Sequence, residues 1–183
     1  DKAISLLGKS TQEQDDYMRG YIDLNSDRFM YHLVANHPER SGQIRDAFNS
    51  HKSGHYFSSI PAFLVLAEGL GRDIFPGIGI YSKHNPKSPK SGTPKTDDLF
   101  DSLSSLNVFD EAILKPLRVK SEVTKTIHYP EPEEHMLFNR HLIMHGTSNN
   151  YGSEINSLKA ISLVYFIQMS FDHLRSKYDL SIQ

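Results

Sequence analysis

The chain has 183 residues, of which 38% are apolar, so it is long enough for one hydrophobic core and fits a single domain. The formal charge of -2, from 20 basic and 22 acidic residues, excludes a general positive field for holding nucleic acid. With no cysteine, disulfides, thiol catalysis and thiolate zinc sites are excluded as well. A nucleic-acid function therefore needs a local site.

Nothing in the sequence indicates a membrane protein. No run approaches the ~20 consecutive apolar residues that span a bilayer, and the first residues lack the basic and then apolar segment of a secretory signal. We therefore expect a cytoplasmic protein with no membrane partner. The chain begins at Asp1 rather than at methionine, which leaves open whether it is a fragment of a longer protein.

The sequence up to about residue 76 predicts three helices. Residues 11–36 and 38–52 predict two helices, separated at the sequence NHPER. Apolar residues at helical spacing predict a third helix that is capped by Ser58 or Ser59, carries Pro61 in its first turn, and ends near residues 75–76.

A glycine pair follows this helix in the sequence PGIGIY, residues 76–81. A dinucleotide-binding loop needs a third glycine and a flanking strand and helix, whereas Ser82 stands at the third position. We reject that interpretation.

A proline- and lysine-rich insertion covers about residues 83–96. Lys83, Lys87, Lys90 and Lys95 are spaced there by proline, serine and glycine. Such a composition buries little apolar surface and predicts a flexible, solvated loop. The alternative is a tether whose lysines bind phosphate.

The second half predicts helices again. Two short helices are expected at about 97–105 and 108–118, and residues 123–129 suit a loop or an edge strand. Pro130 and Pro132 among acidic residues predict the start of a helix that Gly146 ends. A nearly all-apolar helix follows from about 153 to 177. The fold class is therefore all-α.

The segment FNRHLIMHG, residues 138–146, places Arg140, His141 and His145 within six positions of an apolar run. One interpretation is a metal site, in which the two histidines join Glu134 or His135, although Arg140 would repel the cation. A second is structural, with Arg140 paired to an acid and the histidines capping carbonyls at the helix end. A third is a metal-free nuclease, because a guanidinium binds phosphate and an imidazole moves protons near neutral pH.

The string NRHLIMHG resembles the signature of the HEPN superfamily of small helical bundles, many of which are ribonucleases in bacterial toxin–antitoxin, phage-defence and CRISPR systems. The longer string FNRHLIMHGTSNNYGSEINSLKAISL resembles the last two helices of bacterial members. The resemblance extends over about residues 133–170. It implies a single HEPN-like helical domain over residues 1–183, with the insertion at about 83–96.

The resemblance also implies roles for individual residues. Arg140 and His145 match the catalytic pair, and His141 matches the polar residue that orients the pair. Glu68 matches an acid that some members place near the site, although a solvated edge of a core helix explains it as well. One toxin subgroup has a tyrosine two residues after the histidine, where this chain has Thr147, and this departure weakens any case for adenylylation by an antitoxin.

The function implied by the resemblance is a metal-independent endoribonuclease that cleaves RNA through its 2′-hydroxyl, in a toxin or antiviral defence role. We expect no cofactor and no metal. The expected partners are RNA, a second copy of the chain in a homodimer, and an antitoxin or regulatory protein. The alternative is a non-catalytic HEPN-like module that binds nucleotide, RNA or a protein and serves in dimerisation.

Overall fold

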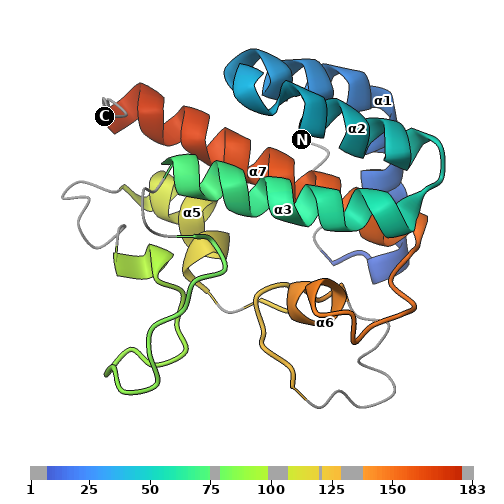
Figure 1. Ribbon diagram of the computed structural model, residues 1–183. Coiled ribbons are helices and arrows are strands. Elements are labelled where there is room, and N and C mark those ends of the chain that lie inside the picture. The colour runs from blue at the N-terminus through green and yellow to red at the C-terminus, as the bar shows by residue number, and fades with distance from the viewer. Residues whose placement is uncertain (1–7, 75–78, 99–106, 120, 129–137, 179–183) are drawn as a thin grey trace. The chain divides into compact units, whose positions relative to one another are not determined.

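The computed structural model describes residues 8–74, 79–98, 107–119, 121–128 and 138–178, and the long elements of this part are all helices (Figure 1). In chain order they are α1 (Thr11–Asn36), the 3-10 helix η2 (Pro38–Arg40), α2 (Ser41–Lys52), α3 (Tyr56–Ile74), α5 (Val108–Arg118), α6 (Arg140–Met144) and α7 (Glu154–Tyr178). Pairing of extended segments in the described residues is limited to one isolated bridge, between Lys83 and Pro94. The predicted all-α fold is confirmed.

The chain divides into two compact units. The first comprises residues 1–63 and 152–162, and the second comprises residues 64–151 and 163–183. Helices α3 and α7 each contribute residues to both units. The single-domain organisation stays a prediction, and each unit is described by itself below.

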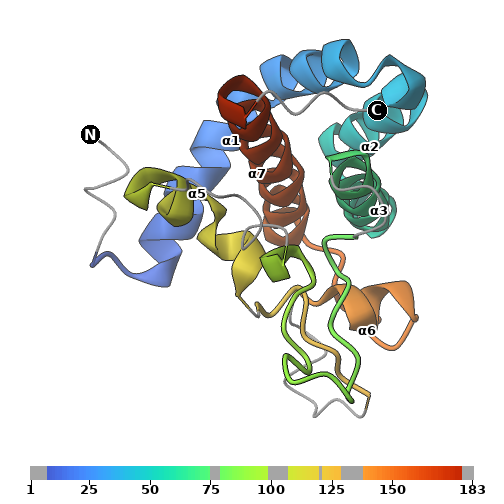
Figure 2. The same cartoon turned by 90° about the vertical axis from the view of Figure 1, so that its left-hand side faces the viewer.

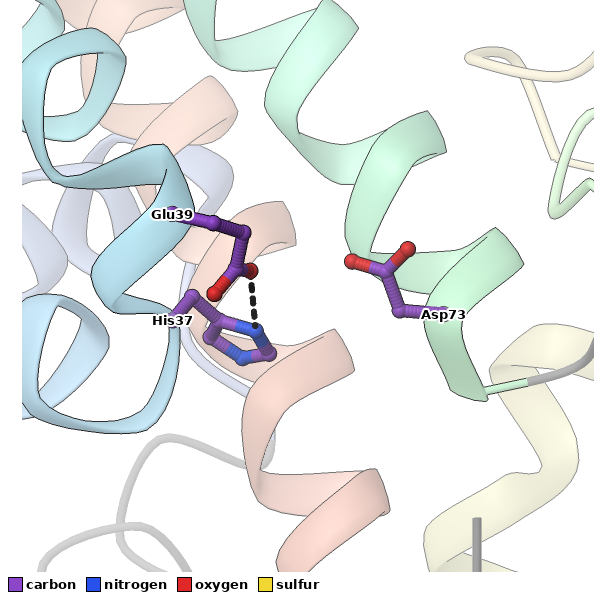
Figure 3. Close-up of side chains that lie close together, drawn as sticks. All are labelled: His37, Glu39 and Asp73. Carbon is purple, nitrogen blue, oxygen red and sulfur yellow. Dashed lines mark ion pairs between the residues drawn. The ribbon is translucent and has the colours of Figure 1, made fainter. Parts of the chain in front are cut away.

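In the first unit, helix α1 has the predicted bounds, whereas the helix predicted at 38–52 divides into the 3-10 helix η2 and helix α2. Ser10 and Glu13 form a capping box at the start of α1, in which each side chain accepts a hydrogen bond from the other residue's backbone N–H. Buried His37 ends α1, and its Nδ1 lies 3.8 Å from the Glu39 carboxylate (Figure 3). Figure 3 also draws Asp73, which belongs to the part of α3 in the second unit.

The core of the first unit is built from one face of each of its helices. Rings of Phe48 on α2 and Phe63 on α3 meet edge to face, with centroids 5.0 Å apart. The other fully or nearly fully buried apolar residues of this unit are Ile22, Phe29, Met30, Leu33, Ile44, Ala47, Ile60, Leu158, Ala160 and Ile161.

The predicted start of α3 was wrong. Helix α3 begins at Tyr56, so Pro61 lies inside the helix and neither Ser58 nor Ser59 is its cap. Proline cannot donate the backbone hydrogen bond of its position, which costs stability within a helix. The apolar residues Ile60 and Phe63 are completely buried on either side of it, and this burial offsets the lost bond.

The second unit has its own core, contributed by α3, α5, α6, α7 and the loops between them. Its buried apolar residues are Leu64, Leu66, Ala67, Leu70, Ile80, Leu114, Leu117, Ile127, Leu142, Ile143, Val164, Ile167, Phe171 and Leu174. Helix α5 confirms the prediction at 108–118. Another helix was predicted at 97–105. Its first two residues, 97 and 98, are helical, and residues 99–106 lie outside the described residues.

The lysine-rich insertion folds back on itself as a closed loop (Figure 2). The backbone N–H of His84 donates to the Thr93 carbonyl, and that of Lys95 donates to the Ser82 carbonyl. Lys90 forms an ion pair with Asp98 at 2.7 Å. The proline- and glycine-rich composition thus forms turns with defined backbone bonds, and the flexibility of the loop stays a prediction.

The predicted extent of the motif helix was also wrong. Helix α6 begins at Arg140, whereas residue 138 is not helical and Asn139 has an extended backbone. Residues 129–137, where the start signals Pro130 and Pro132 fall, lie outside the described residues. The predicted stop was right, because Gly146 adopts a left-handed φ of 69° directly after the helix. Helix α7 confirms the prediction at 153–177 to within one residue at each end.

Candidate active site

The motif helix is held in place by Asn139. This buried residue caps α6, because its side-chain oxygen accepts a hydrogen bond from the backbone N–H of Leu142 at 3.0 Å. Its side-chain amide donates to the backbone carbonyls of Glu122 and Lys125. One buried side chain therefore joins the start of α6 to the turn at residues 121–125, and this explains why the helix begins at Arg140.

Arg140 is positioned by an aromatic side chain. Its guanidinium carbon lies 4.9 Å from the centroid of the Tyr81 ring, within the range of a cation–π interaction. Its backbone N–H donates to the Val123 carbonyl at 3.3 Å. Within the described residues, Arg140 forms no ion pair, so the acid that the structural interpretation assigned to it is not seen there.

Glu68 reaches the same tyrosine from α3. Its carboxylate accepts a hydrogen bond from the backbone N–H of Tyr81 at 3.2 Å and also binds Arg72, one turn along the helix, at 3.1 Å. The Glu68 side chain is only 20% exposed, so it is not a solvated edge of the helix. The structure thus brings two of the four predicted site residues to one tyrosine, Glu68 at its backbone N–H and Arg140 over its ring.

Tyr81 was not predicted as a site residue. Its hydroxyl donates to the Leu64 carbonyl at 3.4 Å, and burial, together with the negative charge of Glu68, raises its pKa well above the usual range. It therefore stays a neutral phenol near neutral pH. The sequence signal nearest to it is Gly79, two residues earlier, and in the structure a Cβ on Gly79 would lie 1.9 Å from a Glu68 carboxylate oxygen. Only glycine allows the chain to approach Glu68 so closely.

The histidines of the motif contact one another. The rings of His141 and His145 have centroids 4.5 Å apart, and the ring of His128 packs edge-on against His141 at 5.2 Å. His128 lies in the turn region before the motif and was not predicted to take part. His145 is exposed at the C-terminal end of α6, where its backbone N–H bonds to the His141 carbonyl.

The environment of His141 favours its neutral form. Burial lowers its pKa, and the positive charges of His145 and His128 act in the same direction, while a backbone interaction with Ile127 opposes them. Its Nδ1 atom is buried and makes no well-formed hydrogen bond to the described residues. The lowered pKa therefore favours a neutral imidazole at His141.

The metal interpretation gains no support from the described residues. His128, His141 and His145 do not bring three ligand atoms close enough together there to share one ion. Glu134 and His135, the other ligands considered for this site, lie outside the described residues. The site as described offers one guanidinium and two exposed imidazoles, those of His145 in the motif and His128 before it.

A cavity of about 470 Å³ lies beside the turn that Asn139 holds. Lys83 and Lys125 line it together with Gly92, Ser121, Glu122 and Thr126, and Lys83 binds the Thr126 hydroxyl at 3.0 Å. Of the four lysines of the insertion, Lys83 is the one that lines this cavity. The phosphate-tether interpretation therefore has a specific location to test.

Comparison with known protein families, with curated proteins and with solved structures finds no match to this chain. The HEPN resemblance therefore rests on the motif and on the helices around it, and it stays a prediction. In the described part of the chain, no helix is both long enough and apolar enough to cross a membrane.

Proposed function

We propose that this chain is a metal-independent endoribonuclease of the HEPN type. The observation that supports the proposal is the fixed position of Arg140, which stacks on Tyr81 beside Glu68 at the start of the helix whose far end exposes His145. A guanidinium without an ion pair among the described residues can bind a phosphate, and an exposed imidazole can transfer a proton.

In the proposed reaction, His145 removes the proton from the 2′-hydroxyl of a ribose. The 2′-oxygen attacks the adjacent phosphorus, and the bond from phosphorus to the 5′-oxygen of the next nucleotide breaks. The products carry a 2′,3′-cyclic phosphate and, after proton transfer to the leaving oxygen, a 5′-hydroxyl. Arg140 stabilises the charge that builds up on the phosphorane oxygens. General acid–base catalysis of this kind contributes about 10²- to 10⁴-fold in rate.

We further propose that RNA is the substrate and that two copies of the chain form the active unit. The reaction needs one group to take a proton and another to return it, and within the motif His145 is the single exposed imidazole, while the exposed His128 lies outside the motif. A second copy related by a two-fold axis would supply the second group. An antitoxin or other regulatory protein is the proposed partner that controls the activity, in the cytoplasm of a bacterial cell.

The second candidate is a non-catalytic module that binds nucleotide, RNA or a protein. One observation favours it: in the described part of the chain Arg140 lies over Tyr81, and no hydrogen bond joins it to His145. Binding and catalysis therefore have to be separated by experiment.

The deciding experiment measures cleavage of a fluorescently labelled RNA with and without EDTA. We expect full activity in EDTA and products that end in a 2′,3′-cyclic phosphate, because no step uses a metal. Arg140→Ala and His145→Ala should each abolish cleavage. Arg45→Ala and His55→Ala remove the same residue types from exposed positions of the first unit and serve as matched controls.

Two results would reject the ribonuclease. Loss of activity in EDTA, restored by zinc or manganese, would replace the arginine–histidine mechanism with a metal site. RNA binding without cleavage by the parent protein, weakened by Arg140→Ala, would establish the non-catalytic module.

A further inference from the structure

The first unit contains a second candidate site, which has no residue in common with the motif. It is a cavity of about 390 Å³, close to the lower end of the range for small-molecule sites. Helices α1, α2, α3 and α7 all contribute to its wall, through Asp23, Asp27, His51, Lys52, Tyr56 and Glu154. All six belong to the first unit.

His51 is the buried polar group of this cavity, since it is only 7% exposed. Its Nδ1 lies 2.9 Å from the hydroxyl oxygen of Ser157, which in turn lies 2.8 Å from the hydroxyl oxygen of Ser59. The hydroxyl of Ser59 donates to the backbone carbonyl of Tyr56. The three side chains form a continuous line of hydrogen bonds that ends on a carbonyl.

If Ser59 donates to the Tyr56 carbonyl, at 3.5 Å, the direction of the whole line of bonds and the tautomer of His51 follow. A carbonyl can only accept, so the proton of Ser59 points to Tyr56, and the proton of Ser157 then points to Ser59. Ser157 is left to accept from Nδ1–H of His51. The neutral ring consequently carries its lone pair on Nε2, at the edge of the ring away from Ser157. Among the described residues, no group hydrogen-bonds to this Nε2.

The charges around the cavity are unbalanced. Asp27 is paired with Lys52, and the Glu154 carboxylate lies 3.3 Å from Nε of Arg19. Asp23 has no ion pair within the described residues. One negative charge at the cavity therefore remains uncompensated.

The negative charges of Asp23 and Glu154 change the pKa of both ring-bearing residues of the cavity, Tyr56 and His51. Burial raises the pKa of the Tyr56 hydroxyl, and the negative charges of Glu154 and Asp23 add to this effect. Burial lowers the pKa of His51, with the same two carboxylates opposing it, so the ring is neutral near neutral pH and its lone pair stays available. The cavity therefore offers an imidazole acceptor, a carboxylate and an aromatic ring together.

We propose that this cavity binds the primary ammonium group of a small aliphatic amine. An ammonium group has three N–H donors and one positive charge, which match the Nε2 acceptor of His51, the unpaired carboxylate of Asp23 and the ring of Tyr56. An anion would be repelled by the acids. A metal ion fits less well, since His51 and the acids of the cavity do not form a group of three close ligand atoms in the described residues.

The test is a calorimetric titration of the full chain with putrescine, a diamine, at neutral pH. We expect saturable binding of putrescine and none of 1,4-butanediol, which has the same length but no charge. Asp23→Asn should weaken binding by about tenfold or more, since it removes a charged partner of the ammonium group. Asp46→Asn changes the net charge equally at an exposed position of α2 and should bind as the parent does.

A second measurement keeps the test independent of folding defects. Nitrogen NMR of the histidine rings should show Nε2 of His51 unprotonated in the free protein and shifted when putrescine binds, with Nδ1 unchanged. Arg140→Ala should bind putrescine normally, because the site is separate from the proposed ribonuclease site.

Several results would overturn the proposal. These are no saturable binding of putrescine, equal binding by Asp23→Asn, and equal binding of the uncharged diol. Zinc that binds through His51 and displaces putrescine would assign the cavity to a metal instead.

Discussion

Arg140 and Tyr81 are stacked, with the guanidinium carbon 4.9 Å from the centroid of the ring, although the two residues are far apart in the sequence. The backbone of the same tyrosine is bound to Glu68. A long, flexible arginine side chain loses rotamer freedom when it binds a phosphate, and an aromatic surface that already restricts it reduces that loss. Tyr81 is therefore the residue that we expect to position Arg140.

Replacing Tyr81 tests this role directly. Tyr81→Leu removes the ring, and we expect kcat for RNA cleavage to fall about fivefold, which corresponds to the ~1 kcal/mol of a partly exposed cation–π interaction. Tyr81→Phe keeps the ring and loses only the bond to the Leu64 carbonyl, so it should retain kcat. The measurements are kcat and KM, with the melting temperature of each variant. A leucine variant with parental kcat and a lower melting temperature would show that the ring is only structural.

Gly79 is the subject of a stability prediction. A Cβ at this position would overlap the Glu68 carboxylate at 1.9 Å, so Gly79→Ala must displace either Glu68 or the segment before Tyr81. We expect a loss of about 0.5–1.5 kcal/mol in the free energy of unfolding, because a displaced Glu68 carboxylate loses its hydrogen bond to the Tyr81 backbone N–H. Thermal or denaturant unfolding measures this loss.

The control for Gly79 is Gly20→Ala in the middle of α1. A Cβ on Gly20 meets nothing within 4 Å, and alanine is favoured over glycine inside a helix by roughly 0.5–1 kcal/mol. Gly20→Ala should therefore stabilise the protein. If the two alanine substitutions had equal effects, the close approach of Gly79 to Glu68 would be refuted.

The helix boundaries that were predicted correctly are those whose signals are local. Ser10 and Glu13 form a capping box within four residues, and Gly146 ends α6 through its own backbone conformation. The errors arose where distant groups decide the structure. Asn139 starts α6 because its amide binds the carbonyls of Glu122 and Lys125, and no local pattern reveals these bonds.

The same distinction applies to the two sites. Arg140, His141 and His145 lie within six positions and could be predicted as a group from the motif. Tyr81 reaches Arg140 only through the tertiary fold. His51 and Ser157 are 106 positions apart, and each has an ordinary sequence context, so their contact becomes visible only in the structure.

The pH dependence of stability should reflect His141. Because its pKa is lowered in the folded state, the unfolded chain takes up a proton first as the pH falls below its ordinary value of about 6.5. Stability should therefore decrease with falling pH until the folded-state pKa is passed, and it should be fully recovered above about pH 7. His51 contributes a slope of the same sign, because burial lowers its pKa as well.

His141→Asn tests this dependence. We expect the substitution to reduce the slope of the unfolding free energy between pH 5 and 7, as measured by denaturant titration at each pH. His55→Asn, at an exposed position, is the matched control and should keep the parental slope. A slope that His141→Asn leaves unchanged would contradict the neutral state assigned to His141.

The last prediction is that the active ribonuclease is a symmetric homodimer. His141 is predicted to stay neutral beside His145, so one copy of the motif has one exposed imidazole for two proton transfers. Two-fold dimers are the commonest oligomers, and a second motif facing the first would supply the missing group. Arg140→Ala and His145→Ala should therefore form dimers and yet be inactive. Light scattering at the assay concentration measures the oligomeric state, and dilution should reduce specific activity as dimers dissociate. Full activity in a monomer would refute the shared site and would require a second proton-transfer group within one chain, for which His128 is the nearest candidate.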